Sequence, residues 1–326
     1  MNNQMAENNK ILKIKTGSQL YGTATPTSDT DYSGIFIADE DYYFGLLTIN
    51  EADNSTKSKN ESGKNTTDAI DDKLYELRNF ARLAMQNNPN IIEHLFVNEA
   101  NIVYIDYFGG DLLAHAHLFP YKGAFDRFIG YASSQKHKMV IKEKHFTELS
   151  AAHHYFQSEP IDKFIVEYRD KHLEFLTEDE QHFNIGDLHF QKHLAVKKFL
   201  AILAERMSKI TNRYELVLKH GYDTKFGSHL IRLLLEGEEL LNTGKIVFPL
   251  WYADTLLEIK KGKYEIGQLL ELATKIEDRM NDAKEKSALP SKPRFDEVNE
   301  LVKQLSKLHL SRAVDEHGFL NTSHIF

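Results

Sequence analysis

Two short motifs near the N-terminus carry the residues that could do chemistry. Gly17-Ser18 follows an apolar run, and Asp29-Thr30-Asp31 enters the next run after a turn. Gly17 would let the backbone approach a phosphate, and Ser18 stands where the first N–H groups of a helix can bind an anion. Asp29 and Asp31, two residues apart on an extended strand, would offer two carboxylates on one face. Together the motifs indicate phosphoryl or nucleotidyl transfer assisted by metal ions.

A third carboxylate from a neighbouring strand would complete a metal cage. Asp71 and Asp72 both stand at the start of the next apolar run, so either one has a suitable place. An Asp-x-Asp pair after a proline is also ordinary turn chemistry, and short motifs match by chance. The link to the upstream Gly-Ser is therefore what makes the pattern specific.

The apolar pattern predicts the elements that must position these residues. The alternation of apolar and polar residues, bounded by turn residues, predicts strands at 11–15, 31–38, 69–75 and 102–105. Helical turns are expected at 18–24, 76–86 and 91–96. The polar stretch 53–68 is expected to form a loop that could close over the site as a lid.

Helical periodicity dominates the chain beyond residue 120. Helices are expected at 136–155, 162–176, 190–210, 224–241 and 266–285. The predicted fold class is therefore α+β, with an N-terminal mixed sheet and helices followed by a mainly helical half. We expect a catalytic domain over residues 1–120 and a helical domain over residues 121–326.

Composition limits the partners and the compartment. A formal net charge of -8 argues against a surface built throughout for nucleic acid, so a polyanion would be met by a local basic surface. The absence of cysteine excludes disulfides, thiolate metal sites and cysteine nucleophiles. No secretory signal or membrane-spanning run is present, and we expect a cytoplasmic protein with no membrane partner. No P-loop, nucleophile elbow or dinucleotide fingerprint occurs.

The motifs resemble the signature of the DNA polymerase beta nucleotidyltransferase superfamily. Residues 17–26, with Ser28-Asp29 and 34–36, look more narrowly like predicted nucleotidyltransferases of bacteria and phages, some of which are associated with RNA repair. Four further segments look like that subfamily: 71–80, Asn88-Pro89-Asn90 with Glu93, His229-Leu230-Ile231-Arg232, and Ser287-Ala288-Leu289-Pro290. In relatives an arginine usually follows the serine of the first motif, whereas Gln19 stands here.

This resemblance implies a polymerase beta-like catalytic domain that uses Mg²⁺ or Mn²⁺ and takes an NTP such as ATP as substrate. It implies that Asp29, Asp31 and Asp71 are the catalytic metal ligands, with Asp72 as the alternative third ligand. By the same correspondence the Gly-Ser turn holds the triphosphate.

Further candidate nucleotide ligands lie in the helical half. Lys225, His229 and Arg232 fall at helical spacing on one face, where cations could clamp a triphosphate. The alternative is a solvated helix face, and the resemblance favours a ligand contact. Together with Gly17 and Ser18 they form the predicted nucleotide-binding set.

The predicted function is transfer of a nucleoside monophosphate from an NTP to a hydroxyl, with release of pyrophosphate and an RNA end as the expected acceptor. Two alternatives remain open: transfer to a protein side chain, and an inactive nucleotide-binding or partner-binding module. Locally basic helices around Lys136 and Lys197 could hold a nucleic-acid acceptor, although most such runs are ordinary solvated faces. For Glu93 we expect a structural role.

Overall fold

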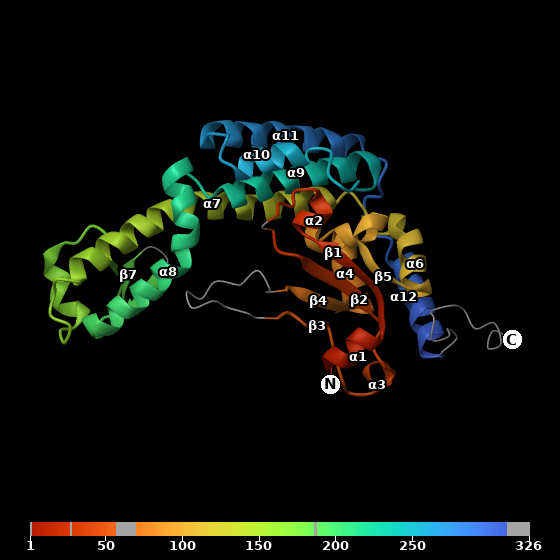
Figure 1. The fold of residues 1–326 in the computed structure, drawn as a ribbon, viewed down its shortest axis with the longest axis horizontal. Coiled ribbons are helices and arrows are strands. Elements are labelled where there is room, and N and C mark those ends of the chain that lie inside the picture. The colour runs from red at the N-terminus through yellow and green to blue at the C-terminus, as the bar shows by residue number, and fades with distance from the viewer. Residues whose placement is uncertain (1, 27, 57–69, 186–187, 312–326) are drawn as a thin grey trace. The chain divides into compact units, whose positions relative to one another are not determined.

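The computed structural model describes residues 2–26, 28–56, 70–185 and 188–311, with the backbone alone for 140–146 and 208–218. Its N-terminal region holds a five-stranded sheet in the order β3-β4-β2-β1-β5 (Figure 1). β2 and β4 are parallel, while the other neighbouring pairs are antiparallel. The strands are β1 (Lys10–Thr16), β2 (Asp31–Phe36), β3 (Glu51–Asp53), β4 (Asp72–Glu76) and β5 (Ile102–Ile105).

The centre of this sheet is β2, whose last four residues are buried between β1 and β4. Because successive side chains of a strand point to opposite faces, each strand presents two different sets of residues. We call the face that carries Asp31 and Ser33 the site face. The opposite face, which carries Lys13, Tyr32 and Asp72 in the strand register, is called the α1 face.

Helices cover both faces of the sheet. On the α1 face, α1 (Asn2–Asn8) buries Ala6 in a cluster with Phe36 and Leu74. On the site face, Phe80 of α4 packs against His94 of η1, with ring centroids 5.8 Å apart. The remaining elements up to residue 118 are α2 (Ser18–Tyr21), α3 (Asp41–Phe44), α4 (Leu77–Met85), α5 (Pro89–Ile92), η1 (Glu93–Phe96), η2 (Glu99–Asn101), α6 (Tyr107–Ala114) and η3 (Ala116–Leu118).

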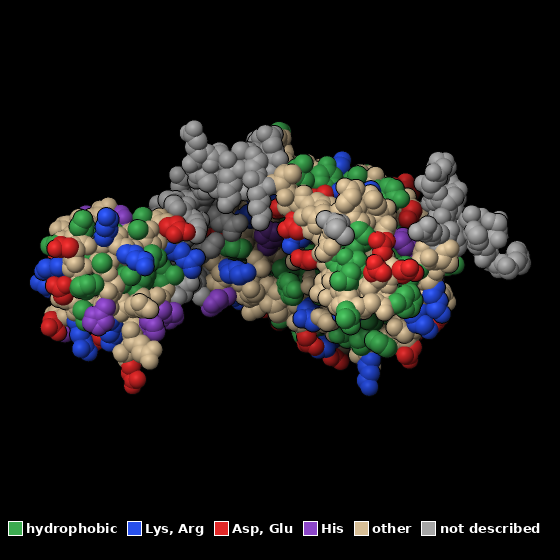
Figure 2. Space-filling view, turned by 90° about the horizontal axis from the view of Figure 1, so that it is seen from below, with side chains coloured by type: hydrophobic (Ala, Val, Ile, Leu, Met, Phe, Trp, Pro, Cys, Tyr) green, Lys and Arg blue, Asp and Glu red, His purple; other side chains and the backbone are tan. Residues whose placement is uncertain are grey.

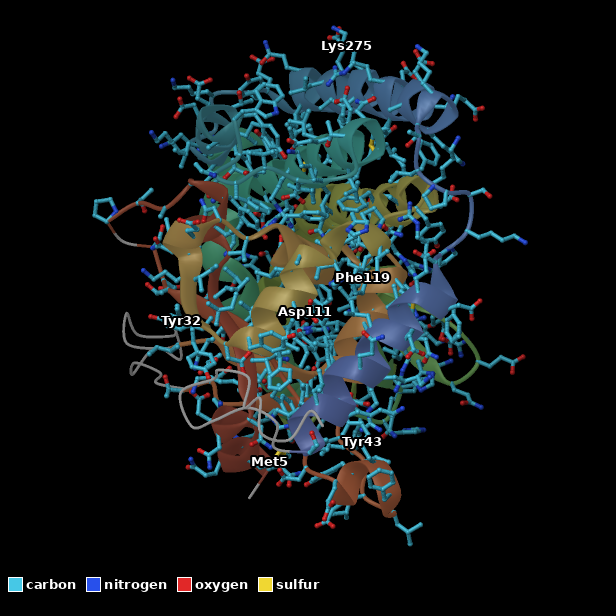
Figure 3. The ribbon with its side chains drawn as sticks, turned by 90° about the vertical axis from the view of Figure 1, so that its right-hand side faces the viewer. Met5, Tyr32, Tyr43, Asp111, Phe119 and Lys275 are labelled. Carbon is cyan, nitrogen blue, oxygen red and sulfur yellow. The ribbon has the colours of Figure 1, made fainter. Side chains whose placement is uncertain are left out.

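A hydrogen-bonded contact joins this region to the last described helix, α12 (Phe295–Leu310). The hydroxyl of Tyr43, labelled in Figure 3, lies 3.1 Å from a carboxylate oxygen of Glu76 and 3.1 Å from the hydroxyl of Ser306. Glu76 also accepts hydrogen bonds from the first N–H groups of α4, including that of Arg78 at 3.0 Å. Glu76 therefore caps α4, and Tyr43 links its carboxylate to α12.

Contacts divide the chain into two compact units that alternate along the sequence. Unit 1 comprises Met1–Ala132, Ile231–Leu257 and Ala273–Phe326, and unit 2 comprises Ser133–Leu230 and Glu258–Leu272. The sheet with the candidate motifs lies in unit 1. The long helices of the second half are α7 (Ala124–Phe156), α8 (Val196–His220), α9 (Thr224–Thr243), α10 (Ala253–Lys260) and α11 (Ile266–Lys286).

Unit 2 has a core of its own. Phe156 of α7 and Phe199 of α8 pack edge to face with ring centroids 5.0 Å apart, and Phe190 lies 4.7 Å from Phe199. Phe190 belongs to a three-stranded antiparallel sheet in the order β6-β7-β8. The elements here are η4 (Ile165–Lys171), β6 (Thr177–Glu178), β7 (His182–Ile185) and β8 (Leu188–Gln191).

The predicted fold class is confirmed: a mixed α/β N-terminal region precedes a mainly helical half. The helix predicted over 162–176 is wrong, because Ile165 and Tyr168 are buried at a spacing of three that a 3-10 turn satisfies, and His172 ends the turn with a φ of 45°. The helix predicted from residue 190 begins at Val196, since Phe190 is buried in β8.

Two expectations about organisation stay predictions. The loop expected at 53–68 falls mostly outside the described residues. The division into functional domains at residue 120 is likewise a prediction, and by contacts unit 1 continues to Ala132. Among the described residues, no helix has the length and apolar character that crossing a membrane requires.

Candidate active site

The candidate site lies where β1 ends and α2 begins. Gly17 has a φ of 60°, a left-handed conformation that residues with a side chain rarely adopt. A Cβ at this position would lie 2.9 Å from Oδ2 of Asp31. The register pairs Thr16 of β1 with Asp31 of β2, so the two antiparallel strands bring the two motifs together. The backbone angle favours glycine here, and an added Cβ would also displace the carboxylate of Asp31.

The helical turn predicted after Gly17 is confirmed. Ser18 is half-buried and begins α2, and the N–H of Tyr21 donates to the carbonyl of Gly17 at 3.0 Å. The N–H of Thr23 donates to the carbonyl of Ser18 at 2.9 Å, and Gly22 ends the helix with a φ of 75°. The Gly-Ser motif is therefore held as a single closed turn.

The β2–β4 register places Asp31 and Asp71 next to each other. Tyr32 pairs with Asp72 in the parallel ladder, and the N–H of Tyr32 donates to the carbonyl of Asp71 at 2.7 Å. Asp31 is the first residue of β2 and Asp71 directly precedes β4, so continuing the ladder by one residue sets Asp31 beside Asp71. Since paired residues of parallel strands point to the same face, Asp31 and Asp71 share the site face.

Asp72 lies on the other face and already has a partner. Nζ of Lys13 is 2.9 Å from Oδ2 of Asp72, and both side chains are only 13% exposed. Burial lowers the pKa of Lys13, but Asp72, together with Glu7, outweighs that effect and raises the pKa overall. Of the two residues considered as a third acid, Asp72 is therefore committed to an ion pair on the α1 face.

Asp29 is exposed and precedes the sheet. β2 begins at Asp31, so the strand alternation that was expected to align Asp29 with Asp31 does not extend to Asp29. The preceding residues form a turn in which the N–H of Thr25 donates to Oγ of Ser28 at 2.9 Å. No ion pair joins Asp29 or Asp71 to another residue of the described ranges.

The predicted metal ligands offer carboxylate oxygens, the donors that Mg²⁺ and Mn²⁺ prefer. Asp31 and Asp71 hold adjacent positions on one face, and Asp29 stands two residues before Asp31. Within the part of the chain that the structure describes, no three acidic or histidine side chains are grouped tightly enough to hold a metal ion. The donor set fits a hard cation, and its assembly around one stays a prediction.

A buried pair that the sequence analysis missed lies one step further along the site face. Nε2 of His94 is 2.7 Å from Oγ of Ser33, and both residues are buried. Burial lowers the pKa of His94 to about 4. Ser33 shares the face of Asp31 by strand alternation, which is the signal that could have found it. The partner, His94, is distant in sequence and carried no such signal.

Arg232 has protein partners of its own. Its Nη1 lies 2.9 Å from Oε2 of Glu236 and 3.4 Å from Oε2 of Glu93, and all three residues are buried. The structural role expected for Glu93 agrees with this contact. A nucleotide contact by Arg232, predicted from its spacing on the helix, would require its charge to leave these carboxylates.

The other two predicted nucleotide ligands of the helical half, Lys225 and His229, are less buried than Arg232. Lys225 is exposed, and its N–H donates to Oδ1 of Asp223 at 3.1 Å near the start of α9. His229 is half-buried. Both belong to unit 2, whereas Arg232 belongs to unit 1 with Gly17. A role for Lys225 and His229 in nucleotide binding remains a prediction.

Charge is unequally divided between the two units. Unit 2 carries 18 Lys and Arg residues against 17 Asp and Glu residues, which leaves 22 against 31 in unit 1 out of the totals of 40 and 48. Lys197 and Lys198 are exposed at the start of α8, and Lys138 is exposed on α7. Lys and Arg side chains are interspersed with acidic ones on the face that Figure 2 displays. Unit 2 is thus the less repulsive half for a polyanion.

Comparison with known proteins agrees with the resemblance seen in the sequence. Residues 3–157 match the model of RlaP, described as the RNA repair pathway DNA polymerase beta family. The chain is 25% identical over 307 residues to an uncharacterized 38.9 kDa protein from the nrdC-mobD intergenic region of Enterobacteria phage T4, covering 84% of this chain and 89% of that protein. No solved structure matches it. The predicted resemblance to the polymerase beta superfamily, and to a subfamily linked to RNA repair, is confirmed over residues 3–157, and a phage protein is among the relatives of the chain.

Proposed function

We propose that this chain, whose residues 3–157 match the RNA repair pathway DNA polymerase beta family, is a metal-dependent nucleotidyltransferase. It moves a nucleoside monophosphate from an NTP such as ATP to a hydroxyl group and releases pyrophosphate. The observation that carries this proposal is the packing of Gly17 against Asp31, with Asp71 beside Asp31 in the sheet register. In this proposal the Gly17-Ser18 turn and the carboxylates of Asp31 and Asp71 lie at the same edge of the site face.

Each residue of this edge has a role in the proposed reaction. Asp31 and Asp71, with Asp29 from the adjoining turn, would hold Mg²⁺ or Mn²⁺. When bound, the metal neutralises charge on the phosphates and acidifies the attacking hydroxyl. Gly17, whose positive φ favours glycine, keeps the turn close to the carboxylate of Asp31, and Ser18 begins the helical turn that follows it.

The reaction exchanges a phosphoanhydride bond of the NTP for a phosphodiester bond to the acceptor. The acceptor oxygen forms a bond to the α-phosphorus while the bond from that phosphorus to the oxygen between the α- and β-phosphates breaks. That oxygen leaves as part of pyrophosphate, and the proton of the acceptor hydroxyl passes to solvent. Positioning and charge neutralisation account for the catalysis, so no covalent enzyme intermediate is required. The description of the matched family favours an RNA end as the acceptor.

A labelled-nucleotide assay tests this function. The purified chain is incubated with Mg²⁺, α-labelled ATP and RNA that ends in a free 3′ hydroxyl, with a parallel protein fraction as an alternative acceptor. We expect the label to move to RNA and Asp31→Asn to reduce the rate by about 1,000-fold, while Asp39→Asn, an exposed acid beyond the other end of β2, keeps it. Full activity of Asp31→Asn would overturn the assignment.

Ligand binding gives a second readout. Saturating Mg²⁺ with a non-hydrolysable ATP analogue should raise the melting temperature of the wild type by several degrees, because only the folded chain binds it. The rise should disappear in Asp31→Asn. A rise of equal size in both proteins would place the nucleotide elsewhere.

A further inference from the structure

A buried polar cluster connects α2 to α9 within unit 1. The hydroxyl of Tyr21 donates to Oε2 of Glu93 at 2.9 Å and lies 3.2 Å from Oε1. Nη1 of Arg232 reaches the same Oε2 at 3.4 Å and both carboxylate oxygens of Glu236 at 3.0 and 2.9 Å. The guanidinium carbon of Arg232 stands 4.4 Å above the ring of Tyr21. Tyr21 thus contacts both the cation and an anion of the cluster.

The charges of this cluster hold Arg232 in place. Tyr21 is 8% exposed, Glu93 3%, Arg232 4% and Glu236 0%. Burial raises the pKa of Glu93 and that of Glu236, and the charge of Arg232 opposes both shifts. One guanidinium therefore faces two buried acids and favours the charged form of each. Withdrawing it would leave buried acids without a counter-charge, an arrangement that proteins avoid.

Tyr21 transmits this anchoring to the Gly-Ser turn. Its N–H donates to the carbonyl of Gly17 at 3.0 Å, and its carbonyl accepts the N–H of Leu250 at 3.2 Å. A Cβ on Gly22 would lie 2.8 Å from Cβ of Pro249, so the far end of α2 also packs closely. Because α2 is a single turn, an anchor at Tyr21 fixes the position of Gly17 beside Asp31.

We propose that Tyr21, Glu93 and Arg232 are positioning residues that hold α2, and with it the Gly17-Ser18 turn, against Asp31. In this arrangement Arg232 acts through Tyr21 and does not contact the nucleotide. The proposal deepens the proposed function and rests on it for the kinetic readout. A structural readout tests it independently of activity.

Tyr21→Phe is the sharpest variant, because it removes one hydroxyl and leaves the ring beneath Arg232. Tyr222→Phe is the matched control: Tyr222 is also buried, and its hydroxyl donates to the carbonyl of Tyr264 at 2.9 Å in unit 2. Amide hydrogen exchange of the N–H groups of Tyr21 and Thr23 is measured in both variants. Tyr21→Phe should speed this exchange about tenfold, and Tyr222→Phe should leave it unchanged. Unchanged exchange in Tyr21→Phe would overturn the proposal.

A double-mutant cycle separates positioning from direct contact. If Arg232 acts through Tyr21, Tyr21→Phe and Arg232→Lys should each raise the KM for ATP several-fold more than they lower kcat. The double variant should then resemble the worse single variant. Effects of the two changes that multiply would mean that Arg232 contacts the nucleotide itself, which contradicts the proposal. A wild type that neither binds nor transfers ATP would refute the proposed function, and the exchange measurement would still decide the positioning.

Discussion

The two faces of the five-stranded sheet carry the same residue type in different settings. Asp71 and Asp72 are neighbours in the chain, yet strand alternation sends them to opposite faces. On the α1 face Asp72 is buried against Lys13 at 2.9 Å. On the site face Asp71 is exposed and stands beside Asp31, next to the turn at Gly17. One acid thus holds the fold together, while the other is available for a cation.

Among the following predictions, substitution of Gly17 on the site face should have the largest effect, a loss of transfer. In Gly17→Ala a Cβ must adopt a left-handed φ and press on Oδ2 of Asp31, so we expect transfer to fall about 100-fold through misplacement of the carboxylate. Gly221→Ala is the control, since Gly221 also has a positive φ but no heavy atom within 4 Å of its added Cβ. Equal activity in the two variants would show that the contact with Asp31 is unimportant.

Removal of the cation on the α1 face should act on stability alone. Lys13→Met leaves Asp72 buried with its charge uncompensated, so the free energy of unfolding should fall by about 2 to 3 kcal/mol. Transfer at a temperature where the variant is folded should be unchanged. Lys73→Met removes an exposed pair with Glu51 at 3.7 Å and should cost less than about 0.5 kcal/mol in urea titrations. Loss of transfer in folded Lys13→Met would mean that residues of the α1 face take part in the reaction, which contradicts the assignment.

The buried histidine of the site face should make stability depend on pH. The pKa of His94 is about 4 in the folded chain and about 6.5 when unfolded, so the unfolded state binds more protons between these values. Stability should fall by about 2 kcal/mol as the pH drops from 7 to 5, and level off below pH 4. Denaturant melts should show a smaller dependence of stability on pH in His94→Gln, and no such change in the exposed control His117→Gln. An unaltered slope in His94→Gln would assign the effect to other groups.

The smallest expected effect is a change in the KM for ATP on substitution of Gln19, a position where the resemblance leads us to expect arginine. Gln19→Arg adds a cation to α2 next to the Gly-Ser turn, and it should lower the KM for ATP about two- to fivefold, as expected for a partly solvated charge near an anion. Gln19→Met, which changes the side chain without adding charge, is the control. A KM that is insensitive to the added charge would place the triphosphate away from α2.

Sequence patterns could identify the strands and the turn that build the site, because their signals are local. Alternation in β1, the glycine at 17 and the acids before β2 and β4 are all readable along the chain. The choice between Asp71 and Asp72 was not readable, since it depends on how β4 pairs with β2 and a shift of one residue reverses the faces.

Long-range partners were invisible for a different reason. Helical spacing suggested a nucleotide contact for Arg232, but its partner Glu93 is far away in sequence. Only the packed structure reveals that the cation is buried. The short strands of unit 2 were missed because two- to four-residue strands next to helical patterns carry too little periodicity.

The most direct test of different roles for the two faces is to compare the rate of nucleotide transfer by Asp71→Asn with that by Asp72→Asn. The two variants change neighbouring acids in the same chemical way. The site-face assignment predicts that Asp71→Asn loses at least about 1,000-fold in rate with little change in melting temperature. Asp72→Asn should keep transfer while folded and melt several degrees lower. Loss of transfer in folded Asp72→Asn, with Asp71→Asn still active, would contradict it.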